Sequence, residues 1–136
     1  MAAKSDASTN KQTVQDAFTA WAGGDGNAFV RLLAEDVRWT VIGTTEISGS
    51  FTTRQEFLDK AAGKIGAVLA RPLEPNLVSV LADGDLVSIQ WEAQAETKSG
   101  RPYRQTYSWV VRFAQGRIVE GTAYLDTELL TAVLSD

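Results

Sequence analysis

Apolar and polar residues alternate most regularly in the last third of the chain, over residues 103–113 and 117–127. A short break containing Gly116 separates the two runs, so together they predict a β-hairpin. Because side chains alternate across a strand, one face of the first run is mostly aromatic. The residues on this face are Tyr103, Gln105, Tyr107, Trp109, Val111 and Phe113. A face of this composition either packs against helices or lines an apolar pocket.

Three earlier segments also have the alternating pattern of strands. Residues 37–41 form one, and residues 77–81 and 86–97 form two more that the turn signal Asp83-Gly84 joins as a hairpin. The alternation of side chains across a strand also predicts which of their aromatic side chains point inward. The tryptophans that share the predicted inward face of three strands are Trp39, Trp91 and Trp109.

Apolar residues at helical spacing predict four helices, over about residues 11–22, 27–34, 53–69 and 128–134. The first carries Val14, Phe18 and Trp21 on one face. The third begins with a capping box, Thr53 and Glu56, and its broad apolar stripe includes Phe57. Residues 43–52, rich in Gly, Ser and Thr, are predicted to form a loop.

Helices that are separate in sequence from a run of antiparallel strands define an α+β domain. We expect a curved antiparallel sheet packed against three helices, forming a cone whose open end can hold a small molecule. The chain has 136 residues, which suits one domain over residues 10–136 behind a disordered N-terminal tail at residues 1–9.

The amino-acid composition limits the ligands that the protein can bind and the catalytic mechanisms that it can use. With a net charge of −4 and no cluster of Lys or Arg, the chain is not expected to bind nucleic acid. It contains neither cysteine nor histidine, which excludes thiolate chemistry, a Ser-His-Asp triad and the usual zinc ligands. Acid–base chemistry would have to use Asp, Glu, Tyr, Lys or water, and we expect no metal and no cofactor.

No segment is long and apolar enough to span a bilayer, and the first ten residues lack the apolar region of a signal peptide. The expectation from sequence is therefore a cytoplasmic protein that does not associate with membranes.

The order of elements and four short motifs resemble the nuclear transport factor 2-like superfamily, and within it the SnoaL-like or ketosteroid-isomerase-related branch. The motifs are Gly-x-x-Tyr at 100–103, aromatic-Val-x-Arg-Phe at 109–113, Gly-Arg-Ile at 116–118 and Tyr-x-Asp-Thr at 124–127. This resemblance implies a cone with an internal pocket, and usually a homodimer formed through the sheet.

The resemblance also shows which family chemistries the residues do not support. The three catalytic positions of ketosteroid isomerases fall at Phe18, at Thr40 or Val41, and at Trp109, none of which has the required group. In limonene epoxide hydrolases an acidic residue stands where this chain has Ala123, and their Arg-x-Asp pair has no counterpart.

Two catalytic candidates remain. SnoaL-like polyketide cyclases use an Asp near the end of the last strand, and Asp126 is the nearest match. The alternative role for Asp126 is to cap the last helix, which we favour because Asp is a preferred N-cap residue. Tyr107 could donate a hydrogen bond to a ligand oxygen, but packing is the commoner role of such a residue.

We expect a small hydrophobic ligand in an aromatic-lined pocket, either as the substrate of a cofactor-independent isomerase, lyase or cyclase or as the ligand of a non-catalytic binding module. A dimeric interaction module is the third possibility. The residues predicted to contact the ligand are Phe18, Trp21, Trp39, Val41, Phe57, Trp91, Tyr107, Trp109 and Leu125.

Overall fold

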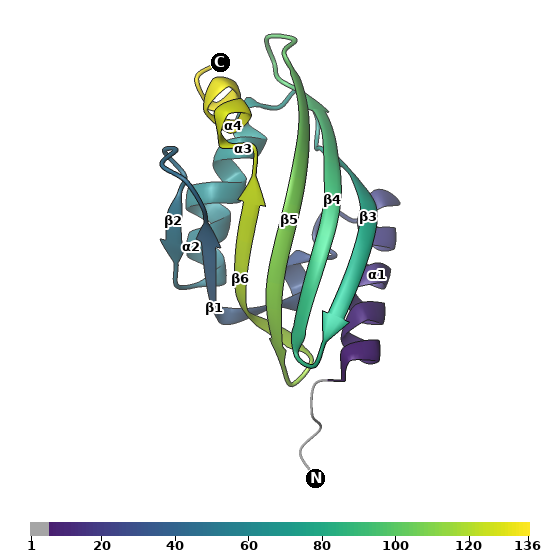
Figure 1. The fold of residues 1–136 in the computed structure, drawn as a ribbon. Coiled ribbons are helices and arrows are strands. Elements are labelled where there is room, and N and C mark those ends of the chain that lie inside the picture. The colour runs from purple at the N-terminus through teal and green to yellow at the C-terminus, as the bar shows by residue number, and fades with distance from the viewer. Residues whose placement is uncertain (1–5) are drawn as a thin grey trace.

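The structure, a computed structural model, describes residues 6–136 and contains a six-stranded sheet with helices on one side (Figure 1). The order of the strands across the sheet is β2-β1-β6-β5-β4-β3. Their bounds are Leu33–Val41 for β1, Gly49–Phe51 for β2, Glu74–Asp83 for β3, Leu86–Glu96 for β4, Pro102–Ala114 for β5 and Arg117–Leu125 for β6. The predicted α+β class is confirmed.

Strands β3 to β6 form an antiparallel meander, as the alternating pattern predicts. The turns between them include Gly84 and Gly116, whose φ angles of 60° and 78° favour glycine. Strand β1 then pairs in parallel with β6, with Trp39 opposite Gly121. This pairing brings the first strand in sequence against β6, and thereby places the tryptophans of β1, β4 and β5 in one sheet.

Helix α1 covers Ala7–Ala22 and begins four residues before the predicted boundary. The reason is an N-cap at Asp6: its carboxylate accepts a hydrogen bond from the Ser8 backbone N–H, and Thr9 donates its hydroxyl to the same carboxylate. Residues 7–9 of the predicted disordered tail are therefore helical, while residues 1–5 of that tail lie outside the described residues.

The helix predicted over residues 27–34 does not form. A single 3₁₀ turn, Val30–Leu32, takes its place, and β1 already begins at Leu33. Within the predicted loop at residues 43–52, the short strand β2 pairs with the end of β1, with Phe51 opposite Trp39. The backbone N–H and C=O groups of β2 are satisfied by β1, a partner strand that the local sequence of residues 43–52 does not reveal.

The helix predicted over residues 53–69 is present but divided. Helix α2, Arg54–Phe57, continues into a π-helical segment, Leu58–Ala62, and then into α3, Gly63–Val68. Thr53 caps α2 as predicted, because its hydroxyl accepts a hydrogen bond from the Glu56 N–H at 3.0 Å. A π-helical turn widens the helix locally, and such turns are frequent at functional sites.

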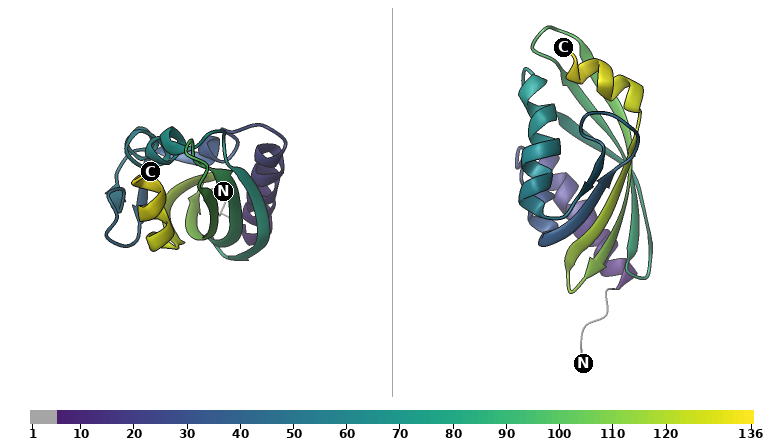
Figure 2. Two further views of the ribbon diagram at one scale, coloured as in Figure 1. Left: turned by 90° about the horizontal axis from the view of Figure 1, so that it is seen from above. Right: turned by 90° about the vertical axis from the view of Figure 1, so that its left-hand side faces the viewer.

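The helices lie against the concave face of the sheet, with α1 on one flank and the α2–α3 segment on the other (Figure 2). Helix α4, Thr127–Leu134, packs near α3 at one end of the cone. Among residues 6–136, no helix has both the length and the hydrophobicity that a membrane crossing requires.

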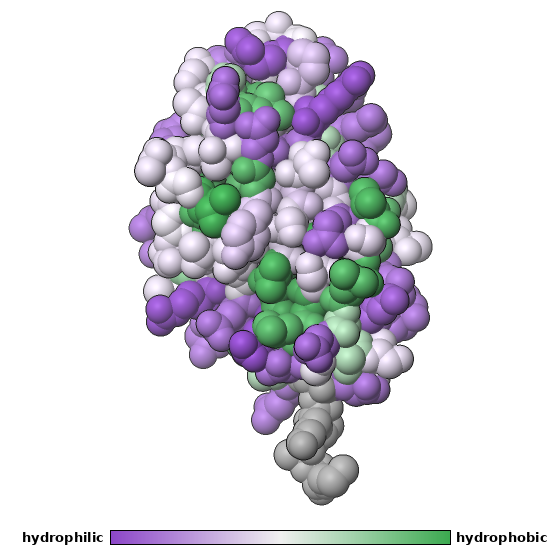
Figure 3. All heavy atoms as spheres, viewed as in Figure 1, coloured by the Kyte–Doolittle hydropathy of each residue, from purple (hydrophilic) through white to green (hydrophobic). Residues whose placement is uncertain are grey.

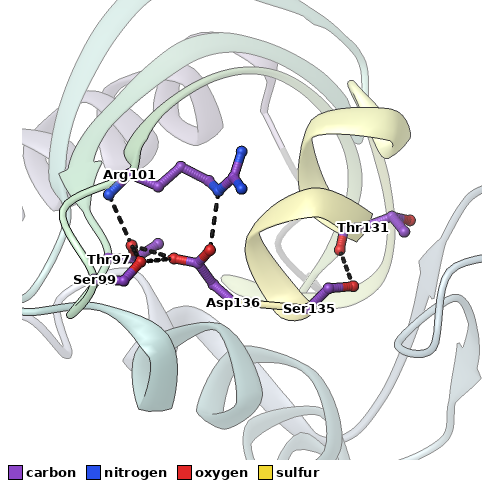
Figure 4. A network of polar contacts seen from close by, with 6 residues as sticks. All are labelled: Thr97, Ser99, Arg101, Thr131, Ser135 and Asp136. Carbon is purple, nitrogen blue, oxygen red and sulfur yellow. Dashed lines mark hydrogen bonds and ion pairs between the residues drawn. The ribbon is translucent and has the colours of Figure 1, made fainter.

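Side-chain contacts fix the end of α4 (Figure 4). The Asp136 carboxylate accepts hydrogen bonds from the hydroxyls of Thr97 and Ser99 in the β4–β5 turn, and from Nε of Arg101 at 3.0 Å. Thr97 also accepts the backbone N–H of Arg101, which holds the turn in shape. Asp136, two residues beyond the end of α4, is thus bound to a turn more than thirty residues earlier in the chain.

The outer face of the sheet is polar over most of its area, but it also exposes large apolar side chains. In Figure 3 these gather over the lower parts of β3, β4 and β5. The large hydrophobic residues exposed by the structure are Val78, Leu81, Leu86 and Tyr124.

Candidate functional site

A cavity of about 420 Å³ lies between the concave face of the sheet and the α2–α3 segment. This volume is typical of sites that enclose a small organic molecule. The sheet contributes Leu33, Trp39, Val41, Trp91, Tyr107, Trp109, Ala123 and Leu125, and the helical side contributes Phe57, Leu58, Ala61, Ala62, Gly63, Ile65, Gly66 and Leu69. The remaining lining residues are Trp21, Gly26, Asn27, Phe29, Val30, Ile47, Pro72 and Leu73.

Three tryptophans from three strands form the aromatic wall of this cavity, as the alternation of side chains along each strand predicted. The indole of Trp109 lies between the other two, with ring centroids 5.2 Å from Trp39 and 4.8 Å from Trp91, in both cases edge to face. Trp21 of α1 completes the wall, 5.1 Å from Trp91. Edge-to-face contacts at these distances stabilise aromatic clusters beyond the area they bury.

Of the nine residues predicted from sequence to contact a ligand, eight line the cavity and Phe18 does not. Phe18 is on the expected face of α1, but its ring lies behind the wall, 5.5 Å from Trp91 and 6.3 Å from Trp109. It therefore supports the wall instead of forming it. The larger indole of Trp21, one turn further along the helix, occupies the position at the cavity.

The lining is almost entirely apolar. Among residues 6–136, no Asp, Glu, Lys or Arg borders the cavity, and apart from the tryptophans its polar side chains are those of Tyr107 and Asn27. Within residues 6–136 there is no group of three or more acidic residues placed to hold a metal ion. This arrangement suits an uncharged ligand, because a buried charge without a partner is costly.

Tyr107 belongs to a short buried chain of polar groups. Its ring stacks on Trp91 with a centroid distance of 4.4 Å and an interplanar angle of 9°. The hydroxyl groups of Tyr107 and Tyr103 are 2.8 Å apart, and Gln105 Nε2 donates to the Tyr103 oxygen at 3.4 Å. Burial raises the pKa of Tyr103, and raises the pKa of Tyr107 well above its usual value. Both phenols are therefore protonated at neutral pH.

Asp126 does not line the cavity. Its exposed carboxylate accepts a hydrogen bond from the Leu129 N–H at 3.0 Å, which makes it the N-cap of α4. This is the capping alternative that the sequence favoured. The backbone of Asp126 has a second role, since its N–H donates to Gln105 Oε1 and its C=O accepts from Gln105 Nε2.

Sequence reasoning missed two groups of residues around the site. The first is the helical wall, including Leu58, Ala61 and Ile65, whose apolar stripe was recognised but not assigned to the cavity. The second is the pair Tyr103 and Gln105, both almost fully buried. The sequence feature that could have revealed this pair is a glutamine on an otherwise aromatic and apolar strand face, because a buried amide needs polar partners.

The indole N–H groups of Trp91 and Trp109 are buried and have no hydrogen-bond partner within residues 6–136. An unpaired buried donor costs free energy, on the order of 1–3 kcal/mol. Their presence in the wall indicates that stability alone does not determine the composition of this part of the core.

Comparison with known proteins places the chain in a family. The sequence pattern of the SnoaL-like domain matches residues 14–121, most of the chain. The chain belongs to the SnoaL-like domain family. A search of curated proteins finds no match to the sequence.

Solved structures share the fold of this SnoaL-like domain at low sequence identity. A nuclear transport factor 2-like protein of unknown function from Burkholderia pseudomallei is 21% identical, with a TM-score of 0.77 over 93% of this chain and 98% of that one. A SnoaL-like protein from Jannaschia, described as a putative polyketide cyclase, is 17% identical, with a TM-score of 0.74 over 94% and 92%. TerC, co-crystallised with polyporic acid, is 13% identical, with a TM-score of 0.75 over 93% and 98%.

Proposed function

We propose that this SnoaL-like domain binds a small, uncharged hydrophobic molecule with a flat ring system inside its aromatic-lined cavity. The observation that carries the proposal is the convergence of Trp39, Trp91 and Trp109 on one cavity of about 420 Å³. A compact core of this size would fill such a space with side chains, whereas the observed cavity leaves room for a ligand.

The chemistry of the lining supports a ligand of this class. Aromatic rings offer flat apolar surfaces, and no charged side chain in the described part of the chain borders the cavity to recognise an ionic group. The crystal structure of TerC with polyporic acid supports the idea that a cone of this fold admits an organic compound.

The structure gives less support to acid–base catalysis. Asp126 caps α4, and of the described residues that line the cavity only Tyr107 has an acidic proton. We therefore propose binding as the primary function. The isomerase or cyclase alternative would depend on Tyr107 as a hydrogen-bond donor to the substrate, without a carboxylate in the cavity.

Tryptophan fluorescence tests the binding proposal directly, because the chain's four tryptophans all lie in the wall of the cavity. Titration with flat aromatic compounds should quench or shift the emission in a saturable way. Steroid-like and polyketide-like compounds should be compared with charged compounds of similar size, which we expect to bind more weakly. If no uncharged compound binds, the proposal fails.

A blocking variant links the signal to the cavity. Gly66 of α3 lines the cavity, and a Cβ added there would meet no atom within 4 Å. Gly66→Phe should therefore be tolerated, place a ring at the cavity and weaken binding by at least about tenfold, which is roughly 1.4 kcal/mol. Ala67→Phe is the matched control, because Ala67 is exposed on the same helix and does not line the cavity.

We further propose that two copies of the domain associate through the outer face of the sheet. The exposed side chains Val78, Leu81 and Leu86 on β3 and β4 support this arrangement. Light scattering should give the mass of a dimer for the unmodified protein and that of a monomer for Leu81→Glu. Thr44→Glu, at an exposed loop position, introduces the same charge and should leave the dimer intact.

A further inference from the structure

Tyr107 ends a chain of buried hydrogen bonds, and the order of donors and acceptors along this chain affects which ligands the cavity selects. The hydrogen-bond chain contains Gln105, Tyr103 and Tyr107, three alternate residues on the inward face of β5. Of these, only Tyr107 lines the cavity. Selection by this chain presupposes the proposed binding function and specifies which polar group the ligand must carry.

The backbone of Asp126 fixes the orientation of the Gln105 amide. The Asp126 N–H requires an acceptor and lies 2.9 Å from Gln105 Oε1, while the Asp126 C=O requires a donor and lies 3.0 Å from Gln105 Nε2. A flipped amide would place donor against donor and acceptor against acceptor. The Thr106 N–H, 3.1 Å from Oε1, favours the same orientation. The nitrogen of Gln105 therefore faces Tyr103.

The Tyr103 hydroxyl consequently accepts from Gln105 and must place its own hydrogen elsewhere. Tyr103 is fully buried, and the Tyr107 oxygen at 2.8 Å is the only other hydroxyl partner within residues 6–136. If Tyr107 donated to Tyr103, the Tyr103 hydrogen would be buried without an acceptor, which is costly. The order that avoids this cost runs from Gln105 to Tyr103 to Tyr107.

The hydrogen of Tyr107 is then left without an acceptor in the described part of the protein. Stacking on Trp91 fixes the plane of the Tyr107 ring, and Tyr107 lines the cavity, so its hydroxyl is held in one place relative to the cavity wall. The raised pKa of Tyr107 keeps this hydrogen in place at neutral pH. A ligand can satisfy the Tyr107 hydrogen only by offering it a hydrogen-bond acceptor.

We propose that Gln105 and Tyr103 are positioning residues that make Tyr107 a one-way hydrogen-bond donor, so that the cavity selects flat apolar ligands bearing a neutral oxygen acceptor, such as a ring ketone. Ligands whose only polar group is a ring N–H are disfavoured, because such a group cannot accept the Tyr107 hydrogen and would place donor against donor.

Three tricyclic compounds of nearly equal shape test this selectivity. Fluorenone carries an acceptor, carbazole carries a donor at the equivalent ring position, and fluorene carries neither. Equilibrium dialysis gives a dissociation constant for each compound with each variant. Because the compounds differ in their own hydration, the informative quantity is the change in their affinity ratios between the unmodified protein and a variant.

Tyr107→Phe should reduce the affinity for fluorenone relative to fluorene by roughly three- to tenfold, the worth of one net hydrogen bond. Tyr103→Phe leaves the Tyr107 hydroxyl free to rotate, and should bring the affinities for fluorenone and carbazole closer together by a similar factor. Tyr124→Phe is the matched control, since Tyr124 is exposed and does not line the cavity; it should leave every ratio unchanged.

Gln105→Glu provides a reversal that a purely structural role would not produce. A carboxylate cannot donate, so Tyr103 would donate to residue 105, Tyr107 would donate to Tyr103, and the Tyr107 oxygen would face the cavity as an acceptor. The preference should then shift from fluorenone toward carbazole. If this variant does not fold, Tyr103→Phe and Tyr107→Phe decide the matter.

The possible outcomes separate the inference from the proposed function. If all three compounds bind but Tyr107→Phe leaves their ratios unchanged, or if Tyr103→Phe leaves the ratio of fluorenone to carbazole unchanged, the inference is overturned and the binding function stands. If none of the three compounds binds although another uncharged compound does in the fluorescence titration, the inference alone is overturned; if no uncharged compound binds, both are overturned. Altered ratios in Tyr107→Phe and Tyr103→Phe, with unaltered ratios in Tyr124→Phe, support the inference.

Discussion

Gly121 of β6 lies directly beneath the indole of Trp39. A Cβ added to Gly121 would be 2.3 Å from Cζ3 and 2.4 Å from Cε3 of that ring, closer than any real contact. The two residues are opposite each other in the parallel pairing of β1 and β6, and Trp39 is 1% exposed. The absence of a side chain at residue 121 therefore allows the indole to lie flat in the wall of the cavity.

Gly121→Ala should lower the free energy of unfolding by about 1–3 kcal/mol, because a buried ring must move to admit the new methyl group. Urea unfolding measures this change. Gly26→Ala is the control, since a Cβ at Gly26 meets no atom within 4 Å. Adding Trp39→Leu to Gly121→Ala should reduce the clash, so the two changes should be non-additive. Additive costs would show that the indole is not the obstacle.

Asp126→Ala should lower stability by about 0.5–2 kcal/mol, the usual cost of removing an N-cap. Asp126→Asn, which retains the capping oxygen, should have a smaller effect. Because the carboxylate does not line the cavity, neither change should alter the affinity for an aromatic ligand. A large loss of ligand binding or turnover in Asp126→Asn would restore the catalytic interpretation of this residue.

The contacts of Asp136 make stability depend on acidity. Hydrogen bonds from Ser99, Thr97 and Arg101 lower its pKa from 3.8 to about 2. Since the folded state binds this proton less readily than the unfolded state, the stabilisation is present above about pH 4 and disappears as the pH falls toward about 2.

Asp136→Asn should therefore unfold at a lower urea concentration than the unmodified protein near neutral pH, and the difference should shrink between about pH 4 and about pH 2. Glu96→Gln removes an exposed carboxylate from the same end of the sheet and serves as the control. A difference that stays constant over this range would mean that the charge of Asp136 does not contribute.

Much of this architecture could be predicted from local sequence patterns. The alternation of residues in β4 and β5 fixes which side chains share a face, so the inward positions of Trp91 and Trp109 follow from one property of a strand. The hairpin turns at Gly84 and Gly116 are equally local signals. The meander and its aromatic face were predictable for this reason.

Features that depend on distant partners were not predictable in the same way. Phe18 and Trp21 share a helical face, but Phe18 packs against the ring of Trp91 and only Trp21 reaches the cavity. Which of the two does so depends on the positions of rings from other elements. Likewise, Gln105 alternates correctly on its strand, but its role depends on the backbone of Asp126, 21 residues later. Sequence periodicity gives the direction of a side chain, not its partner.

Helix α4 is attached at both ends, through the contact of Gln105 with Asp126 at its start and the contacts of Asp136 with the β4–β5 turn at its finish. A helix of only two turns ordinarily opens and closes freely in water. With both ends secured, its backbone amides should exchange their hydrogens with solvent about as slowly as those of the neighbouring sheet. This terminal segment should therefore stay packed against α3 and β5 when the rest of the domain fluctuates.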